Sequence, residues 1–252
     1  MILRQPSGLL RSGLWLGFFG VILLAWLAMF AMARMSGLDL LGRSIAPNGM
    51  PMESYGALAA MWGLMMAAMM GPTLVPTLRA YDDLILSAGA TRGGWLGVLA
   101  GYFAVWLVFA MGIAGVQTAL LRAGLIDGLG MATSATFTGA LLLAVGLFQF
   151  TRTKEICHGV CHAPTIHFIG HWRPGARGGL RMGATLGAYC AACCWGMMAL
   201  GFVGGTMSLL WMGAATLFMV LEKLPQIGHR VIRPLGAILI LAGLVVLSGI
   251  LF

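Results

Sequence analysis

Long apolar segments separated by short polar stretches leave this chain few folds to choose from. Seven such segments can be drawn, at about residues 14–34, 56–78, 95–120, 132–150, 182–204, 208–224 and 234–252. Several reach the roughly 20 residues that an α-helix needs to cross the hydrocarbon core of a bilayer. Only 9% of the residues are charged, against about 25% in a typical soluble domain. The pattern predicts an all-α, polytopic transmembrane helix bundle that forms a single integral membrane domain over residues 1–252.

The Lys and Arg residues predict how these segments are oriented. With the N-terminus in the cytoplasm, only Arg34, Arg43 and Arg122 fall on the outer side. The cytoplasmic side receives the other Lys and Arg residues, which are Arg4, Arg11, Arg79, Arg92, Arg152, Lys154, Arg173, Arg177, Arg181, Lys223, Arg230 and Arg233. Because short cytoplasmic loops are enriched in Lys and Arg, we expect about seven spans, a cytoplasmic N-terminus, and a location in the lipid bilayer of a bacterial inner membrane. The same distribution accounts for the net charge of +8 without a nucleic-acid partner.

The sequence CHGVCH lies in the longest polar stretch, residues 151–181, which this orientation makes a cytoplasmic Cys/His loop. Residues four apart share one face of a helix, so Cys157 would neighbour Cys161, and His158 would neighbour His162. Thiolate and imidazole ligands suit copper(I) or zinc. A c-type haem is disfavoured because its attachment signal, C-x-x-C-H, is one residue shorter. The alternative is a polar loop whose Cys and His side chains only pack near the headgroups.

Sulfur-containing side chains also occur inside two of the predicted spans. The fifth segment holds Cys190, Cys193 and Cys194, and the second holds Met65 and Met69 at a spacing of four. Both groups lie at similar depth, as a ladder of thiol and thioether ligands for copper(I) would require. We therefore expect a second, copper-selective position, apart from CHGVCH, in which the fifth segment faces the second. Packing alone is the alternative, because buried cysteine behaves as a small hydrophobe and methionine fills gaps.

A few polar residues outside these motifs complete the expectations. His167 and His171 repeat the spacing of four. Glu222 lies near the inner end of an apolar segment and is a functional candidate, because ionisable residues inside membranes are functional candidates by default. A simple pair with the adjacent Lys223 explains Glu222 equally well. Asp82 is expected in the loop after the second segment.

Several motifs together resemble an uncharacterised bacterial family of predicted metal-binding integral membrane proteins. They are MWGLMMAAMMGP, KEICHGVCHAP, HWRPGARGGLRMG, YCAACCWGMMALGFVGG and LEK. The resemblance runs from about residue 57 to 224. It implies a metal site that draws on the methionines of the second segment and on Cys157, Cys161, Cys190, Cys193 and Cys194.

Three classes of function are compatible with these features. The leading one is a transition-metal-binding membrane protein, most readily one that handles copper(I) in trafficking, loading or export, with a soluble metallochaperone or a larger membrane complex as partner. The second is a redox or cofactor-bearing subunit with thiols, haem or an iron–sulfur centre, and the third is a structural accessory subunit. The sequence carries no G-x-G-x-x-G, P-loop, G-x-S-x-G or H-E-x-x-H motif, so a binding role is favoured over an enzymatic one.

Overall fold

The computed structural model describes residues 7–42, 54–87, 89–224 and 227–249. These residues form helices and no β-strand, so the predicted all-α class is confirmed. Arg4 and Arg43, which entered the charge comparison, lie outside the described residues. The helices are α1 (Ser7–Met35), α2 (Tyr55–Ser87), α3 (Arg92–Arg122), α4 (Ala135–Phe148), α5 (Arg152–His162), α6 (Pro164–Gly170), α7 (Gly175–Ala199), α8 (Gly201–Gly204), α9 (Leu209–Glu222) and α10 (Gly228–Leu247).

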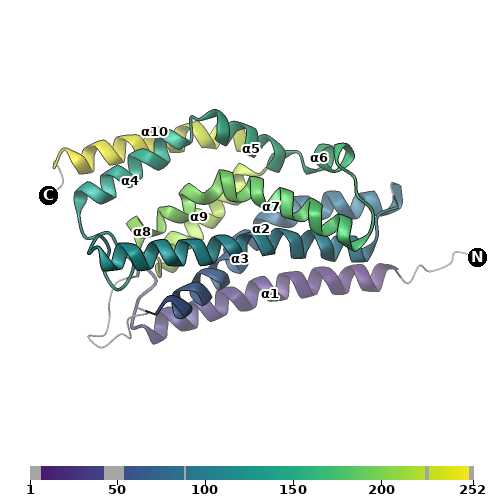
Figure 1. The fold of residues 1–252 in the computed structure, drawn as a ribbon, viewed down its shortest axis with the longest axis horizontal. Coiled ribbons are helices and arrows are strands. Elements are labelled where there is room, and N and C mark those ends of the chain that lie inside the picture. Colours follow the sequence, from purple (N-terminus) through teal and green to yellow (C-terminus); the bar gives the residue numbers. More distant parts are fainter. Residues whose placement is uncertain (1–6, 43–53, 88, 225–226, 250–252) are drawn as a thin grey trace, which may run out of the picture.

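Most helices run along the long axis of the molecule, and the chain passes back and forth between its two ends (Figure 1). Within the described residues, five helical segments are long and apolar enough to cross a membrane, and they contain α1, α2, α3, α7 and α10. α4 and α5 qualify as a sixth only if they are taken together as one bent segment. The predicted segments 132–150 and 208–224 contain helices of only 14 residues. Seven spans therefore stay a prediction.

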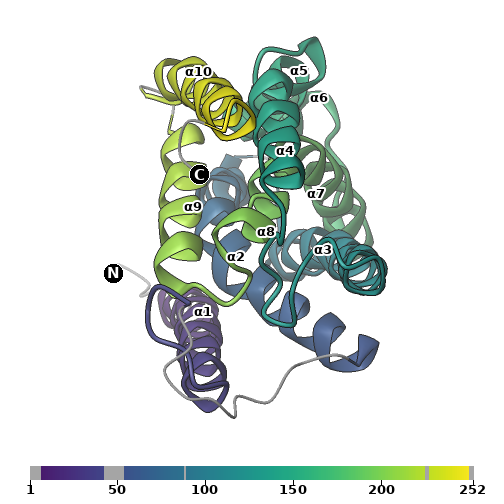
Figure 2. The same cartoon turned by 90° about the vertical axis from the view of Figure 1, so that its left-hand side faces the viewer.

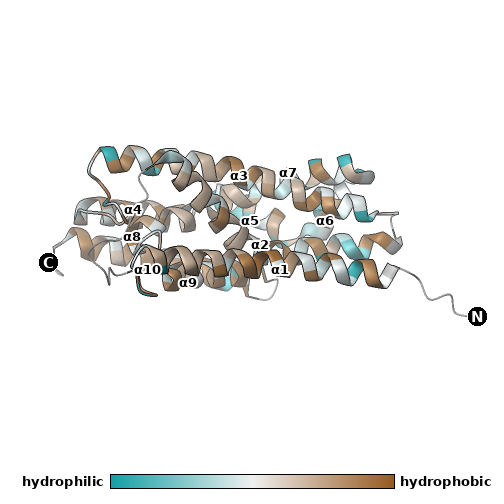
Figure 3. Ribbon diagram, turned by 90° about the horizontal axis from the view of Figure 1, so that it is seen from below, coloured by the Kyte–Doolittle hydropathy of each residue, from teal (hydrophilic) through white to brown (hydrophobic). Residues whose placement is uncertain are grey.

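The helices consist mostly of hydrophobic residues, whereas hydrophilic residues gather mainly toward the ends of the bundle (Figure 3). α10 and α1 lie at the top and bottom of the bundle in Figure 2. Their outer faces are apolar, with Leu241 of α10 62% exposed and Leu16 of α1 74% exposed. Extended apolar surface of this kind marks contact with a membrane or with another protein. The exterior is thus compatible with the predicted membrane location.

α3 and α7 form the most extensive helix pair of the bundle. Glycines allow the two backbones to approach closely. A Cβ atom added at Gly101 of α3 would lie 2.0 Å from the carbonyl oxygen of Leu180, and one added at Gly183 of α7 would lie 2.1 Å from that of Val98. Even alanine would force the helices apart at these positions. The contact therefore fixes α7, and the cysteines that it carries, against α3.

α4 and α5 are separated by a bend of 62°. The hydroxyl of Thr151 caps α5 by accepting a hydrogen bond from the backbone N–H of Lys154 (3.3 Å). α5 ends at His162, just before Pro164, because proline cannot donate the hydrogen bond that would continue the helix. The predicted loop 151–181 is therefore mostly helical and contains α5, α6 and the first turns of α7. α5 packs on α7, so CHGVCH lies against the bundle.

The second helix continues well beyond its predicted end, to Ser87. Asp82, expected in a loop, instead lies within α2. Its carboxylate accepts hydrogen bonds from the side chains of Arg11 and Trp15 of α1, both at 2.9 Å, and forms an ion pair with Arg92 of α3. The expectation was wrong because the two arginines neutralise the carboxylate, so the helix does not have to end before it.

Candidate metal centre

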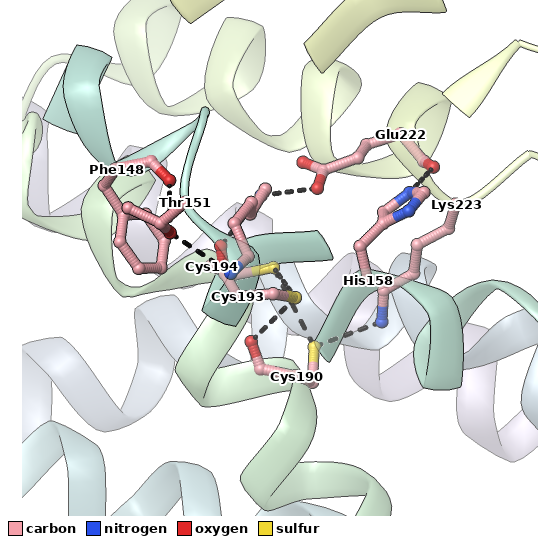
Figure 4. A network of polar contacts seen from close by, with 9 residues as sticks. Phe148, Thr151, His158, Cys190, Cys193, Cys194, Glu222 and Lys223 are labelled. Atoms are coloured by element: carbon pink, nitrogen blue, oxygen red, sulfur yellow. Dashed lines mark hydrogen bonds and ion pairs between the residues drawn. The ribbon is translucent and has the colours of Figure 1, made fainter. Parts of the chain in front are cut away.

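Four cysteine side chains converge where α5 packs on α7. Cys190, Cys193 and Cys194 lie on one face of α7, as positions three and four residues apart do, and Cys161 comes from the last turn of α5. The sulfur atoms of Cys161, Cys190 and Cys193 all lie within 4.8 Å of one another. The sulfur atom of Cys194 lies 3.3 Å from that of Cys193 and 4.0 Å from that of Cys190 (Figure 4). We refer to these four cysteines as the sulfur cluster.

The sulfur cluster is closed off from solvent. Cys190 and Cys194 are 0% and 1% exposed, and Cys161 is 6% exposed. Cys157 is also buried, but its sulfur is not part of the three-atom group. The prediction of two separate positions is corrected here, because the bend before α5 turns Cys161 onto the α7 cysteines. The two sequence motifs thus contribute to one site.

Two buried lysines flank the sulfur cluster. The Nζ of Lys223 donates a hydrogen bond to the Sγ of Cys190 (3.1 Å; Figure 4). The Nζ of Lys154 donates to the carbonyl oxygen of Cys193 (2.8 Å) and forms an ion pair with Glu222. Adjacent residues do not face each other on a helix, so Glu222 pairs with Lys154 of α5 and not with Lys223. Two positive charges therefore lie beside the cysteines.

Tyr102 of α3 connects the sulfur cluster to α2. Its hydroxyl oxygen lies 3.0 Å from the Sγ of Cys190 and 3.1 Å from the hydroxyl oxygen of Thr73. The Thr73 hydroxyl donates to the carbonyl oxygen of Met70 (2.9 Å), so it accepts the hydrogen bond from Tyr102. The Nζ of Lys223 also lies 5.8 Å from the centre of the Tyr102 ring. Cys190 is therefore held by a polar network inside an otherwise apolar core.

His158 and His162 lie beside each other on α5, with ring centroids 5.2 Å apart. The Nε2 of His158 lies 2.8 Å from the carbonyl oxygen of Glu222. A carbonyl only accepts, so Nε2 carries the proton and cannot itself bind a metal. The three-atom group contains sulfur atoms alone. His162 lines a cavity of about 710 Å³ whose lining also includes Lys223, the partner of Cys190.

Met65 and Met69 are both buried on α2. α2 packs mainly on α1 and α3, whereas α7 packs mainly on α3 and α5, and Tyr102 connects Thr73 of α2 to Cys190 of α7. Met69 lies one turn before Thr73 and shares its helical face, because residues four apart are neighbours. Met65 lies a further turn back. Direct contact between these methionines and the cysteines stays a prediction.

Three residues that touch the sulfur cluster were given no role by the sequence patterns. These patterns assigned Lys154 only a part in the charge distribution, assigned Lys223 in addition a possible pairing with Glu222, and placed Tyr102 in an apolar segment. One signal was present for Tyr102, because a buried tyrosine hydroxyl needs a hydrogen-bond partner. No comparable signal distinguishes the two lysines from lysines at a membrane surface.

Three thiols at these separations can share one metal ion. A zinc–sulfur bond is about 2.3 Å long, so sulfur atoms around one such ion lie no more than about 4.6 Å apart, close to the 4.8 Å limit that contains the three sulfur atoms. Thiolates are soft ligands suited to copper(I), and they must lose their protons to bind it. The ammonium group of Lys223, beside Cys190, offsets part of the negative charge that this leaves in a buried site, whereas that of Lys154 is paired with Glu222.

Apolar helices that enclose thiols between two lysines define the chain as a helical protein with a candidate soft-metal site. A family model described as PpoB2, copper chaperone, matches residues 59–246, more than half of the chain. The chain belongs to this copper chaperone family. The matched residues contain the whole sulfur cluster and both lysines. A search of the curated proteins and a search of the solved structures found no match.

Proposed function

We propose that the protein is a membrane-embedded copper chaperone that binds copper(I) in the sulfur cluster and passes it to a partner. The observation that carries the proposal is the convergence of three buried sulfur atoms, those of Cys161, Cys190 and Cys193, within 4.8 Å. Membership of the copper chaperone family supports copper as the metal. A chaperone must also release its metal, and coordination by three thiolates, which leaves room for an incoming ligand, supports release to a partner.

The donor set favours copper(I) over zinc. Structural zinc sites are almost always four-coordinate and tetrahedral, whereas only three of the four sulfur atoms of the sulfur cluster lie mutually within 4.8 Å. Soft thiolates suit copper(I) as well as zinc, and the copper chaperone family favours copper(I). A three-coordinate ion also leaves room for an incoming ligand, which lets a partner's thiolate bind before the ion departs. The site thus combines binding with exchange.

Copper content separates this proposal from the alternatives. The protein is purified in detergent, loaded with copper(I) under reducing conditions, and assayed for copper per chain. The double change Cys190→Ser and Cys193→Ser should abolish loading, because serine lacks the soft, ionisable thiol. Cys157→Ser is the matched control, since it changes a buried α5 cysteine outside the three-atom group. Unchanged copper content in the folded double variant would contradict the proposal.

We propose that the bundle lies in the membrane with residues 151–181, and most of the other Lys and Arg residues, on the cytoplasmic side. Exposed apolar faces and the five long apolar helical segments support the insertion, and the Lys and Arg distribution supports the orientation. Cys157 is buried and unsuited to surface labelling. A cysteine introduced at the exposed Gly170 of α6, in a background without the native cysteines, is the better probe. Labelling of intact cells by an impermeant thiol reagent would contradict this orientation.

One distance favours a different function, a thiol–disulfide carrier. The sulfur atoms of Cys193 and Cys194 are 3.3 Å apart. However, adjacent Cα atoms are about 3.8 Å apart, below the range of about 4.4–6.8 Å usual for disulfides. A bridge between neighbours would therefore distort α7. A disulfide that forms reversibly between these two residues, detected by mass spectrometry in protein that binds no copper, would favour the carrier.

A further inference from the structure

His167 and His171 form a second pair of imidazoles, outside the sulfur cluster. They project from α6 and the residue that follows it, and their rings stack with centroids 4.6 Å apart and an angle of 19° between planes. The neutral imidazole ring is the commonest metal ligand in proteins. His171 is exposed and His167 is partly buried, so the pair lies where a ligand from outside can reach it.

The hydrogen bonds of this pair leave ring nitrogens available. The Nδ1 of His171 lies 3.2 Å from the carbonyl oxygen of His167. The carbonyl accepts, so Nδ1 donates, and Nε2 takes no part in this hydrogen bond. Metal-binding histidines are commonly oriented in this way. The Nε2 of His167 has no hydrogen-bond partner among the described residues.

The cavity beside the pair is positively charged. It has a volume of about 400 Å³, and its lining includes both histidines together with Arg173, Arg181 and Thr185. Two arginines disfavour a free metal cation by charge repulsion. They favour an anion, and copper(I) held by two thiolates is an anion. The combination of arginines and imidazoles therefore suits copper that arrives already bound to thiolates.

The cavity lies close to the sulfur cluster along α7. Thr185 is five residues before Cys190, which is roughly 7.5 Å at the rise of an α-helix. The His167 ring also lies 6.2 Å, centroid to centroid, from the ring of Tyr189, the residue next to Cys190. The imidazole pair of α6 thus lies beside α7, and Thr185, which lines the cavity, is less than two helical turns from Cys190 along that helix.

We infer that His167 and His171 are an outer metal site that receives copper(I) from an anionic thiolate complex and passes it to the sulfur cluster. The inference rests on the proposed function. In the exchange, a bond from copper to the carrier's sulfur breaks as a bond to an imidazole nitrogen forms. The thiolate leaves with its electron pair, and the metal remains copper(I). The arginines draw in the complex, and the thiols of the cluster take the ion because they are the softer ligands.

The test measures the rate of loading separately from the final copper content. The purified chain in detergent is mixed with the copper(I)–glutathione complex, and loading is followed by rapid mixing. The double change His167→Asn and His171→Asn should slow loading on the order of tenfold or more, the scale on which metal-site partners act, and leave the final content unchanged. Thr165→Ala, an exposed change on the same helix, is the matched control. Equal rates, or a loss of final content, would overturn the inference.

A second measurement tests the charge of the carrier. The double change Arg173→Gln and Arg181→Gln should slow loading from the anionic glutathione complex by about tenfold, the low end of electrostatic steering. Loading from the cationic copper(I)–acetonitrile complex should not slow. Equal slowing with both carriers would overturn the inference. Failure of the proposed function is distinguishable, because the unchanged protein would then take up no copper from either source.

Discussion

Two buried carboxylates, Asp82 and Glu222, contrast in the partners that neutralise them. The side chain of Asp82 is 1% exposed, but its partners Arg11 and Arg92 are 54% and 27% exposed. The side chain of Glu222 is 2% exposed, and that of its partner Lys154 only 1%. Asp82 therefore connects three helices through arginines that reach solvent. Glu222 belongs to an ion pair that is buried entirely.

The difference in burial between the two ion pairs indicates which carboxylate serves the candidate metal site. A buried ion pair has to overcome a desolvation cost that an apolar pair of similar size would avoid. A contribution to stability is therefore a weak explanation for the burial of the Glu222–Lys154 ion pair. The contacts of the pair supply a better explanation. Lys154 also donates a hydrogen bond to the carbonyl oxygen of Cys193, and His158 donates one to the backbone carbonyl oxygen of Glu222. The buried pair organises the sulfur cluster, whereas Asp82 fastens helices together.

The largest predicted effect is the loss of stability when each carboxylate is removed in turn. Glu222→Ala should lower the free energy of unfolding by about 3–5 kcal/mol, because it leaves the ammonium group of Lys154 buried and unpaired. Denaturant titration of the purified protein in detergent, followed by tryptophan fluorescence, measures the change. A loss no greater than that of Asp82→Ala would remove the contrast.

Asp82→Ala should have a smaller effect, a loss of about 1–3 kcal/mol, the scale of hydrogen bonds to charged groups. Arg11 and Arg92 can return to water when their partner is removed, since both are partly exposed. The same denaturant titration measures this loss in the free energy of unfolding. Because Arg11 and Trp15 hold α1 to α2 through this carboxylate, faster protease cleavage within α1 should accompany the loss. Unchanged cleavage would mean that other contacts fasten α1.

The third prediction concerns a variant in which both members of the buried Lys154–Glu222 pair are replaced by apolar residues. Lys154→Met combined with Glu222→Leu should leave stability within about 1 kcal/mol of the unchanged protein or raise it, because buried pairs are often replaceable by apolar groups. Copper(I) affinity should nevertheless fall by about tenfold, since Cys193 loses a partner that orients it. Competition with a chromophoric copper(I) chelator measures the affinity. Unchanged affinity would return the pair to a structural role.

The smallest predicted effect concerns salt. Raising the salt concentration from about 0.1 M to 1 M shortens the screening length from about 10 Å to 3 Å. It should weaken the solvent-exposed arginine contacts of Asp82 by a few tenths of a kcal/mol, within the range of exposed ion pairs. The salt dependence should shrink in Asp82→Ala and persist in Glu222→Ala. A salt dependence that instead disappears with Glu222 would reverse the comparison.

The sequence predicted the helical class and most helix positions because both follow from local patterns of apolar residues. It also identified Cys161, Cys190, Cys193 and Cys194 as candidate ligands from residue type and spacing. It could not join them into one site, because the 62° bend before α5 depends on packing between residues distant in the chain. The role of Lys223 escaped for the same reason, since a lysine at a membrane surface has the same local sequence. Long-range packing decided what local patterns left open.

The cap at Thr151 and the bend before α5 have a consequence for comparing related chains. Each added residue turns an α-helix by about 100°. A single insertion between Thr151 and Cys161 would therefore rotate the Cys161 sulfur away from α7, however conservative the inserted residue. A substitution at the exposed Ile156 would leave the sulfur in place. Among relatives that keep this site, we expect the number of residues between the cap and the last cysteine of α5 to vary less than their identity.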